Sequence, residues 1–302
     1  MLAFHSKKLF NNIEKHIINK QRFAGGGYLL RTEKDCELGY TFYYFGYGSN
    51  LNLTSFRSKG VEPLSYEPVV LQGWKLVFNV RHWFRHEGGV GNIVATNNPQ
   101  DEVHGLLYTC KDEQLASLDL MESFGVAYDR VELGFDTPAG RVKAKTYVGL
   151  PAYLDNARLP TRRYLDILLN GAKTAGLNEG YIEKLRHHPV QHNKNYPPFL
   201  PPAATGLVFD QESLKQYPLY TALAGAVFDM ANARSDLQCI WDLFGGKDMT
   251  LFHLKRLECS DRDETLEQIK QGNLSKAAHK YLNAYLHEYN SEFQYVGCYE
   301  YG

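Results

Sequence analysis

The stretch Phe42-Tyr43-Tyr44-Phe45-Gly46-Tyr47-Gly48-Ser49-Asn50 is an aromatic run that breaks into a polar turn. Aromatic residues at this density favour a buried β-strand. Gly48 and Asn50 tolerate positive φ, so we expect the chain to turn sharply where the strand ends. Such a turn can direct several backbone N–H groups at one point and form an anion or oxyanion cradle. A tight strand-to-helix turn without a ligand explains the same residues, so this stretch alone leaves both interpretations open.

Strand patterns continue beyond this turn. Segments rich in β-branched and aromatic residues lie between turn signals at 69–71, 75–80, 91–96, 103–108 and 144–148. Helical patterns interrupt them at 111–122 and 162–175, each with leucines on one face. Many short strands in a short length of chain predict a small closed or strongly bent sheet. The predicted fold class is therefore α+β.

The composition is that of an ordinary globular protein. Of the 302 residues, 44% are hydrophobic and 22% are charged, and the formal net charge is −1. This length accommodates two domains. The charge gives no reason to expect nucleic acid or an anionic membrane as a partner, because both need a clustered basic surface. No uninterrupted apolar run approaches the roughly 18 residues of a membrane span. We therefore predict a cytoplasmic protein without a nucleic-acid partner or a membrane span.

Cysteines and histidines are scattered along the chain. The five cysteines form no Cys-x-x-Cys pair, and their odd number argues against a closed disulfide set, so we expect free thiols. His187 and His188 are adjacent, but the local sequence offers no further ligands, so no metal site is predicted.

Residues 1–39 carry apolar side chains at helical spacing with lysines between them. Glu14 lies in the middle of this pattern, and no small-residue cleavage site follows it. We therefore predict an added N-terminal helical extension rather than a targeting segment.

Glu122 is the candidate general acid or base. It ends the first predicted helix between Met121 and Phe124, and Gly125 is a natural residue to follow a helix end. Apolar neighbours remove water from a carboxylate and favour its protonated form, which suits proton transfer near neutral pH. The alternative is a surface carboxylate, because glutamates are mostly exposed. Asp119, one turn earlier, is expected to face solvent or to cap a loop.

Four motifs occur in order between residues 40 and 190. They are Tyr47-Gly48-Ser49-Asn50-Leu51, Gly88-Gly89-Val90 with 101–105, Leu118-Asp119-x-x-Glu122 followed by Tyr128, and 171–177 with 181–185. Their order and spacing resemble those of the γ-glutamylcyclotransferase family. The resemblance implies a small mixed β-barrel with helices as the catalytic domain, over residues 40–190.

The resemblance also implies a reaction. Family members bind the γ-glutamyl group against the loop that corresponds to Tyr47–Leu51, and they use a glutamate at the position of Glu122 as general acid and base. The α-amine of the substrate attacks its own γ-carbonyl, which gives 5-oxoproline and a free amine. Tyr128 matches a family tyrosine, although the segment before it is slightly shorter here. The implied partner is a small γ-glutamyl amide or peptide whose leaving amine stays open.

Other activities have less support. Ser49 and Ser123 do not lie in G-x-S-x-G, and no ordered His and Asp partners can be named for a serine hydrolase. The glycines of 86–91 lack the Lys-Ser/Thr of a phosphate loop, so a strand-entry turn explains them better. A non-catalytic binding protein on the same scaffold is the second hypothesis, and it would apply if Glu122 faced away from the Tyr47 loop. Loops such as Trp83–Glu87 are expected to shape the leaving-group end.

Residues 191–205 are rich in proline, which predicts an extended linker. Beyond it, Leu223-x-Gly225-x-Val227-Phe228-Asp229, the segment 244–250 and the segment 293–297 resemble the cytochrome b5-like fold, and most closely its membrane-associated progesterone receptor branch. The resemblance implies a second α+β domain over residues 206–302.

This second domain is predicted to bind no haem and to need no cofactor. The His-Pro-Gly-Gly haem motif is absent, and Trp241 aligns with the axial tyrosine of that branch, although an indole cannot donate a lone pair to iron. His253, His279 and His287 are left as alternative ligands. The vacant cleft could bind a small apolar ligand, or aromatic side chains such as Phe244 could fill it and make a module for a protein partner.

Overall fold

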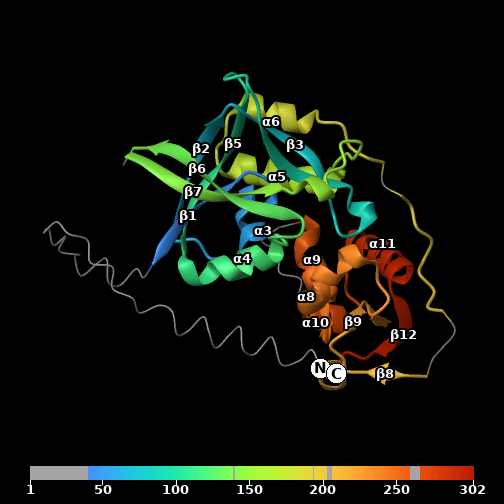
Figure 1. The fold of residues 1–302 in the computed structure, drawn as a ribbon. Coiled ribbons are helices and arrows are strands. Elements are labelled where there is room, and N and C mark those ends of the chain that lie inside the picture. Colours follow the sequence, from blue (N-terminus) through green and yellow to red (C-terminus); the bar gives the residue numbers. More distant parts are fainter. Residues whose placement is uncertain (1–39, 139, 193, 203–205, 259–265) are drawn as a thin grey trace, which may run out of the picture. The chain divides into compact units, whose positions relative to one another are not determined.

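The aromatic run is the central strand of a five-stranded sheet. β1 (Thr41–Gly46) pairs with β5 (Glu102–Lys111) in antiparallel and with β7 (Gly140–Gly149) in parallel orientation. The order is β2-β5-β1-β7-β6, with β2 (Ser65–Gln72) and β6 (Tyr128–Thr137) at the edges (Figure 1). The strands curl into a half-barrel, and the predicted fold class, α+β, is confirmed.

The structure is a computed structural model that describes residues 40–138, 140–192, 194–202, 206–258 and 266–302. Contacts divide the chain into two units, residues 1–39 and residues 40–302. The predicted N-terminal helical extension lies outside the described residues. The predicted boundaries inside the second unit, at residues 190 and 206, stay a prediction.

A two-stranded sheet accompanies the larger one. β3 (Trp74–Arg81) pairs with β4 (Gly89–Ala95), and a 3-10 turn, η2 (Arg85–Glu87), lies between them. Gly88 has a φ of 73°, and a Cβ there would overlap the carbonyl of Leu159, so only glycine suits this turn into the strand. The glycines of 86–91 therefore form a strand-entry turn, as predicted.

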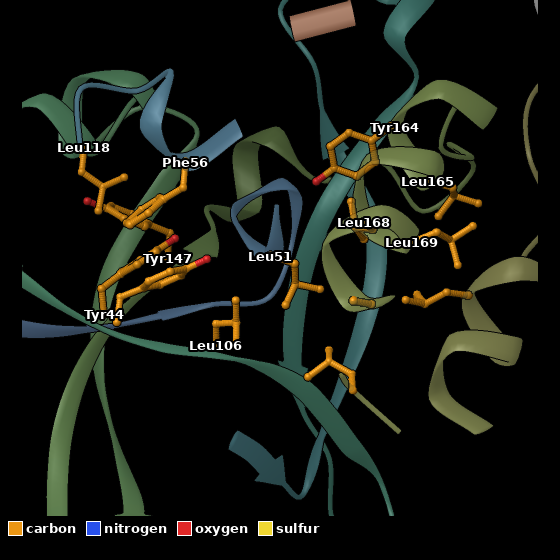
Figure 2. Packing of buried hydrophobic residues seen from close by; sticks show 14 of the residues in the cluster. Tyr44, Leu51, Phe56, Leu106, Leu118, Tyr147, Tyr164, Leu165, Leu168 and Leu169 are labelled. Carbon is orange, nitrogen blue, oxygen red and sulfur yellow. The ribbon is translucent and has the colours of Figure 1, made fainter. Parts of the chain in front are cut away.

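The helices of this half pack around the end of β1. η1 (Ser49–Leu51) and α3 (Leu53–Arg57) follow the strand, and η3 (Asp112–Gln114), α4 (Leu115–Met121), η4 (Pro151–Tyr153), α5 (Arg162–Thr174) and α6 (Glu179–Arg186) come later. Phe56 of α3 stacks on Tyr44 and Tyr108, with ring centroids 5.4 and 4.4 Å away. Leu165 and Leu168 of α5 are fully buried in the same core as Leu51 (Figure 2). This packing holds the loop after β1 against α5.

Residues after 206 form a second five-stranded sheet of order β11-β9-β10-β12-β8. Its strands are β8 (Val208–Phe209), β9 (Tyr220–Leu223), β10 (Ala226–Asp229), β11 (Lys247–Asp248) and β12 (Gln294–Tyr299). The accompanying helices are α7 (Gln211–Leu214), η5 (Ser235–Ile240), α8 (Trp241–Phe244), α9 (Thr250–Glu258), α10 (Leu266–Lys270) and α11 (Lys276–Glu292). The predicted strand pair around 222–229 and the closing strand correspond to β9, β10 and β12.

Phe84, from the segment between β3 and β4, lies in the core of this C-terminal half. Its side chain is 1% exposed and stacks on Tyr289, with ring centroids 5.1 Å apart, and on Phe244 at 6.2 Å. Its ring also meets His253 edge-on at 6.2 Å. The sequence left open whether the interior of this half is a vacant cleft or is filled by aromatic side chains. The structure shows aromatic side chains there, and Phe84 is one that the sequence did not indicate.

The histidines of this half do not converge on a haem pocket. His253 is buried, and its Nε2 lies 2.8 Å from the hydroxyl of Tyr289. His279 is exposed at the start of α11, and His287 contacts the carbonyl of Pro197 at 2.9 Å. The aromatic filling around Phe84 and the dispersed histidines do not fit a haem group.

The proline-rich segment packs along α11 instead of spanning open space. The N–H of Phe199 donates to Asn283 Oδ1 at 2.7 Å, and Asn283 Nδ2 donates to the carbonyl of Pro197 at 2.8 Å. The hydroxyl of Tyr196 donates to Glu288 at 3.0 Å. Residues 194–202 therefore have defined partners on this helix.

Within the described ranges, none of the helices is both long and apolar enough to cross a bilayer. In that same part of the chain, no three of the His, Cys, Asp and Glu side chains gather closely enough to hold a metal ion.

Candidate active site

Glu122 caps the C-terminal end of α4. Its N–H donates to the carbonyl of Leu118 at 3.0 Å, which closes the last helical turn. The chain then leaves the helix through Ser123, which has a φ of 51°, and Gly125, which has a φ of 78°. Gly125 takes the positive φ expected of a residue after a helix end. Ser123 also has a positive φ, which is uncommon for a residue with a side chain. This turn fixes the direction of the Glu122 side chain.

The Glu122 carboxylate is held by two polar side chains. Its Oε1 accepts hydrogen bonds from Lys59 Nζ at 2.6 Å and from Asn50 Nδ2 at 3.0 Å. The Lys59 and Glu122 side chains are only 6% and 13% exposed. Of the two expected apolar neighbours, Met121 lines the same cavity as Glu122. Phe124 does not cover the carboxylate, because it is 41% exposed and its ring lies beside the guanidinium of Arg130, at 4.7 Å. A buried ion pair takes the place of this apolar neighbour.

The loop after β1 meets this carboxylate through Asn50. Asn50 Nδ2 also donates to the hydroxyl of Tyr44 at 2.5 Å, and the Asn50 carbonyl accepts from the hydroxyl of Tyr108 at 2.6 Å. Its Oδ1 is buried and has no partner among the described residues. This oxygen is therefore an acceptor that a bound molecule can use.

The other loop residues divide between the cavity and the core. Ser49 lines the same cavity as Glu122. Gly48 lies close to Tyr164, whose hydroxyl would be 3.1 Å from a Cβ at this position. Tyr47 donates to a backbone carbonyl across the sheet at 2.6 Å, and Leu51 is 1% exposed in the core. Tyr47 and Leu51 thus anchor the loop that carries Ser49 and Asn50.

Tyr128 and Tyr164 both bind the backbone of Gly91. The Tyr128 hydroxyl donates to the Gly91 carbonyl at 2.8 Å, and the Gly91 N–H donates to the Tyr164 hydroxyl at 2.9 Å. Burial raises the pKa of Tyr164 to about 12, with the charge of Glu122 adding to the shift and backbone hydrogen bonds opposing it. Burial also raises the pKa of Tyr128 well above its usual value. Both side chains line the cavity as neutral phenols.

Asp119 has a structural role that the sequence did not indicate. It accepts a hydrogen bond from the hydroxyl of Tyr147 at 2.6 Å and pairs with Arg130. Asp119 was expected to face solvent or to cap a loop. Its side chain is instead 22% exposed and binds Tyr147 and Arg130.

A cavity of about 80 Å³ joins these groups to a basic end. Its polar lining near Glu122 consists of Ser49, Ser55, Lys59, Ser123, Tyr128 and Tyr164. Its other end is lined by Arg81, His82, Trp83, Arg163 and Arg256. Of the residues at this basic end, the sequence indicated only those of the Trp83 loop. Lys59 and the three arginines lie on segments that carry no motif.

His82 is neutral at this basic end. Burial lowers the pKa of His82 to about 3, and the nearby Arg256 and Arg163 lower it further while Glu87 opposes the shift. Its Nδ1 accepts the N–H of Phe84 at 3.1 Å, so the neutral ring supports the segment that enters the C-terminal core. Arg163 pairs in turn with the fully buried Glu87.

Comparisons with known proteins relate the part of the chain that contains Glu122 to a known family. Residues 102–185 match the AIG2-like family. The gamma-glutamylcyclotransferase of Mus musculus is 31% identical over 163 residues, which cover 50% of this chain and 84% of the relative. The Homo sapiens gamma-glutamylcyclotransferase is 30% identical over 151 residues, which cover 48% of this chain and 78% of the relative. The chain therefore belongs to the AIG2-like gamma-glutamylcyclotransferase family.

A solved structure of a gamma-glutamyl cyclotransferase is 28% identical, covers 50% of this chain and 90% of that chain, and has a TM-score of 0.44. The relatives found by sequence establish the family, and this structural match is not needed for it. Because each of these matches covers about half of the chain, they do not test the resemblance of residues 206–302 to cytochrome b5.

Proposed function

We propose that this protein is a γ-glutamylcyclotransferase that releases 5-oxoproline and a free amine from a γ-glutamyl amide. The observation that carries the proposal is the contact between Glu122 and the loop after β1, where Asn50 Nδ2 lies 3.0 Å from Glu122 Oε1. A non-catalytic scaffold has no need for a carboxylate directed at this loop. A Glu122 side chain that faced away from the loop would have favoured the binding-protein hypothesis.

The reaction needs no nucleophile from the protein. The α-nitrogen of the substrate bonds to its own γ-carbon, and the bond between that carbon and the leaving nitrogen breaks. The cavity has to fold the substrate so that these atoms meet, which is a positioning effect. The α-ammonium carries three protons and the lactam nitrogen keeps one, so two protons have to leave it. Glu122 takes the first before the attack and gives it to the leaving nitrogen. Glu122 then takes the second, once the bond to the γ-carbon has formed, and gives it to the same nitrogen, which departs as an ammonium.

The loop supplies the groups that hold the γ-glutamyl portion. The unpartnered Asn50 Oδ1 is an acceptor for the α-ammonium, beside the carboxylate that receives its proton. Backbone N–H groups of Ser49 and Asn50 are our candidates for donors to the oxyanion that forms on the γ-carbonyl. The neutral Tyr164 lines the cavity and can donate to a substrate oxygen, because its hydroxyl accepts from the Gly91 N–H. The Tyr128 hydroxyl already donates to the Gly91 carbonyl, so Tyr128 can only accept from a substrate group.

Lys59 is proposed as a positioning residue. Its ammonium lies 2.6 Å from Glu122 Oε1, on the same oxygen that contacts Asn50. The ion pair holds one oxygen in place and leaves Oε2 for the proton transfers. Lysine is suited to this role because it is a point charge with several donors.

We also propose that residues 206–302 form a cytochrome b5-like domain that binds no haem. Support comes from the five-stranded sheet with its closing strand β12 and from the helices between β10 and β12. The burial of Phe84 in this core supports a fixed association with the catalytic half.

The test is 5-oxoproline release from a panel of γ-glutamyl amides by the wild type and by Glu122→Gln. We expect release by the wild type and a loss of about 10²- to 10⁴-fold in the variant, because proton transfer by a positioned side chain contributes that much. Glu113→Gln is the matched control, since Glu113 is exposed just before α4. A variant with full activity would refute the role of Glu122. A wild type inactive on every amide would favour the binding protein.

A further inference from the structure

Two cavities meet at Arg81. The cavity that contains Glu122 shares Arg81, His82 and Trp83 with a second cavity of about 330 Å³. Both halves of the chain build the second cavity, because its lining includes Tyr153 and Arg158 from one half and Arg234 and Asp236 from the other. Arg81 therefore lies in the lining of both cavities.

Most cations around the two cavities have carboxylate partners. Lys59 pairs with Glu122, and Arg163 pairs with Glu87. The remaining pairs are Arg158 with Asp155, Arg85 with Glu292, and Arg234 with Asp236 and Glu292. These pairs hold the walls in place and offset their charge.

Arg81 differs from these residues. One of its terminal nitrogens donates to the carbonyl of Ala152 at 2.7 Å, and its guanidinium lies 5.3 Å from the ring centre of Tyr153. Its Nε is buried without a hydrogen-bond partner in the described ranges. No carboxylate there lies within ion-pair distance of Arg81, and the carboxylate on which its charge acts is Asp155, which pairs with Arg158. A buried, unpaired donor on a charged group costs free energy, and a bound anion would remove that cost.

His82, the neighbour of Arg81 in the chain, is neutral. Burial is the main cause that lowers its pKa; Glu87 opposes the shift, and Arg256 and Arg163 add to it. The neutral imidazole adds no charge of its own, so the attraction for an anion at this place comes from the Arg81 guanidinium.

We propose that Arg81 binds a carboxylate on the leaving amine, so that the enzyme selects γ-glutamyl amides of amino acids or peptides over those of neutral amines and polyamines. This inference rests on the proposed function and adds the residue that chooses the substrate. A guanidinium binds a carboxylate through two parallel hydrogen bonds, which Nε and one terminal nitrogen can supply. The γ-glutamyl group occupies the cavity at Glu122, and the rest of the amine extends past Arg81.

The test compares γ-glutamyl-alanine with γ-glutamyl-alaninamide, which has the same size without the carboxylate. We measure kcat/KM from 5-oxoproline release by the full-length wild type, Arg81→Gln and Arg81→Lys. Arg81→Gln should lower kcat/KM for γ-glutamyl-alanine by about 10- to 100-fold, the usual worth of a hydrogen bond to a charged group. The value for the alaninamide should stay within a few-fold. The kcat/KM of Arg81→Lys for γ-glutamyl-alanine should lie between those of the wild type and Arg81→Gln, because lysine keeps the charge but cannot form two parallel hydrogen bonds.

Arg141→Gln is the matched control, since the Arg141 side chain is 71% exposed on the hairpin of β6 and β7. Equal kcat/KM of the wild type for the two amides, or an equal loss on both in Arg81→Gln, would overturn the inference and leave the proposed function intact. A wild type that releases 5-oxoproline from neither amide, nor from the wider panel, would overturn both.

Discussion

The ion pair between Lys59 and Glu122 gives a prediction about stability that can be worked from its geometry. The charged atoms are 2.6 Å apart, and the two side chains are 6% and 13% exposed. At an effective dielectric constant of about 20, charges at this distance attract by about 6 kcal/mol before desolvation is subtracted. Removing one partner of a buried pair costs about 3–5 kcal/mol, because the other charge stays buried. Asn50 still donates to Glu122 in Lys59→Met, so we expect a loss near 3 kcal/mol.

A double-mutant cycle separates this charge effect from packing. Lys59→Met and Glu122→Gln each leave one buried charge, whereas the double variant leaves none. We therefore expect the double variant to be more stable than the sum of the single losses predicts, with a coupling of about 2–3 kcal/mol. Urea unfolding at pH 7, followed by far-ultraviolet circular dichroism, measures each free energy of unfolding.

The pair Arg57–Glu62 is the internal control. Its atoms are 2.7 Å apart, but the side chains are 51% and 62% exposed. The same cycle on this pair should give a coupling below about 1 kcal/mol, because solvent screens exposed charges. If the losses at Lys59 and Glu122 simply add, the pair does not hold the site, and Lys59 has no positioning role.

Two further predictions concern the segment between β3 and β4. Phe84→Ala should lower the free energy of unfolding by about 3–5 kcal/mol in urea, because it empties a site in the C-terminal core; a loss below about 1 kcal/mol would show that Phe84 does not lie there. The pKa of His82 is about 3 in the fold against an ordinary 6.5, so the unfolded chain takes up the proton first and stability falls as the pH drops through 6.5. Between pH 7 and pH 5 the wild type should lose about 2 kcal/mol more than His82→Gln does; equal losses would contradict a neutral His82.

Several features of the fold follow from local sequence. The strand from Thr41 to Gly46 and the turn after it were predicted because the preferences of aromatic and turn residues act within a few residues. The expectation of positive φ at this turn was wrong, because Gly48 has a φ of −99° and Asn50 has no positive φ either. Gly48 instead leaves room for the Tyr164 hydroxyl, which would be 3.1 Å from a Cβ at this position. The helix that ends at Glu122 and the helix from Arg162 were predicted from their leucine spacing. The edge strand β6 was not predicted, because an edge strand with one buried face carries many charged residues and lacks a continuous apolar pattern.

The resemblance to a known family selected Glu122 and the loop after β1, but it did not indicate their surroundings. The sequence predicted an apolar setting for Glu122 from its immediate neighbours, whereas the structure gives it Lys59, which is 63 residues away. The motif at Tyr128 placed the tyrosine in the cavity, and only the structure showed that its hydroxyl binds Gly91.

The sequence by itself determined the α+β class and the strand and turn that present the loop. These features depend on periodicity and on the conformational preferences of adjacent residues. The tertiary structure alone decided that Lys59 holds Glu122, that Arg81 lies where two cavities meet, and that Phe84 fills the core of the C-terminal half. The physical reason is separation along the chain: Glu87 meets Tyr285 across 198 residues, and no local preference can specify such a contact.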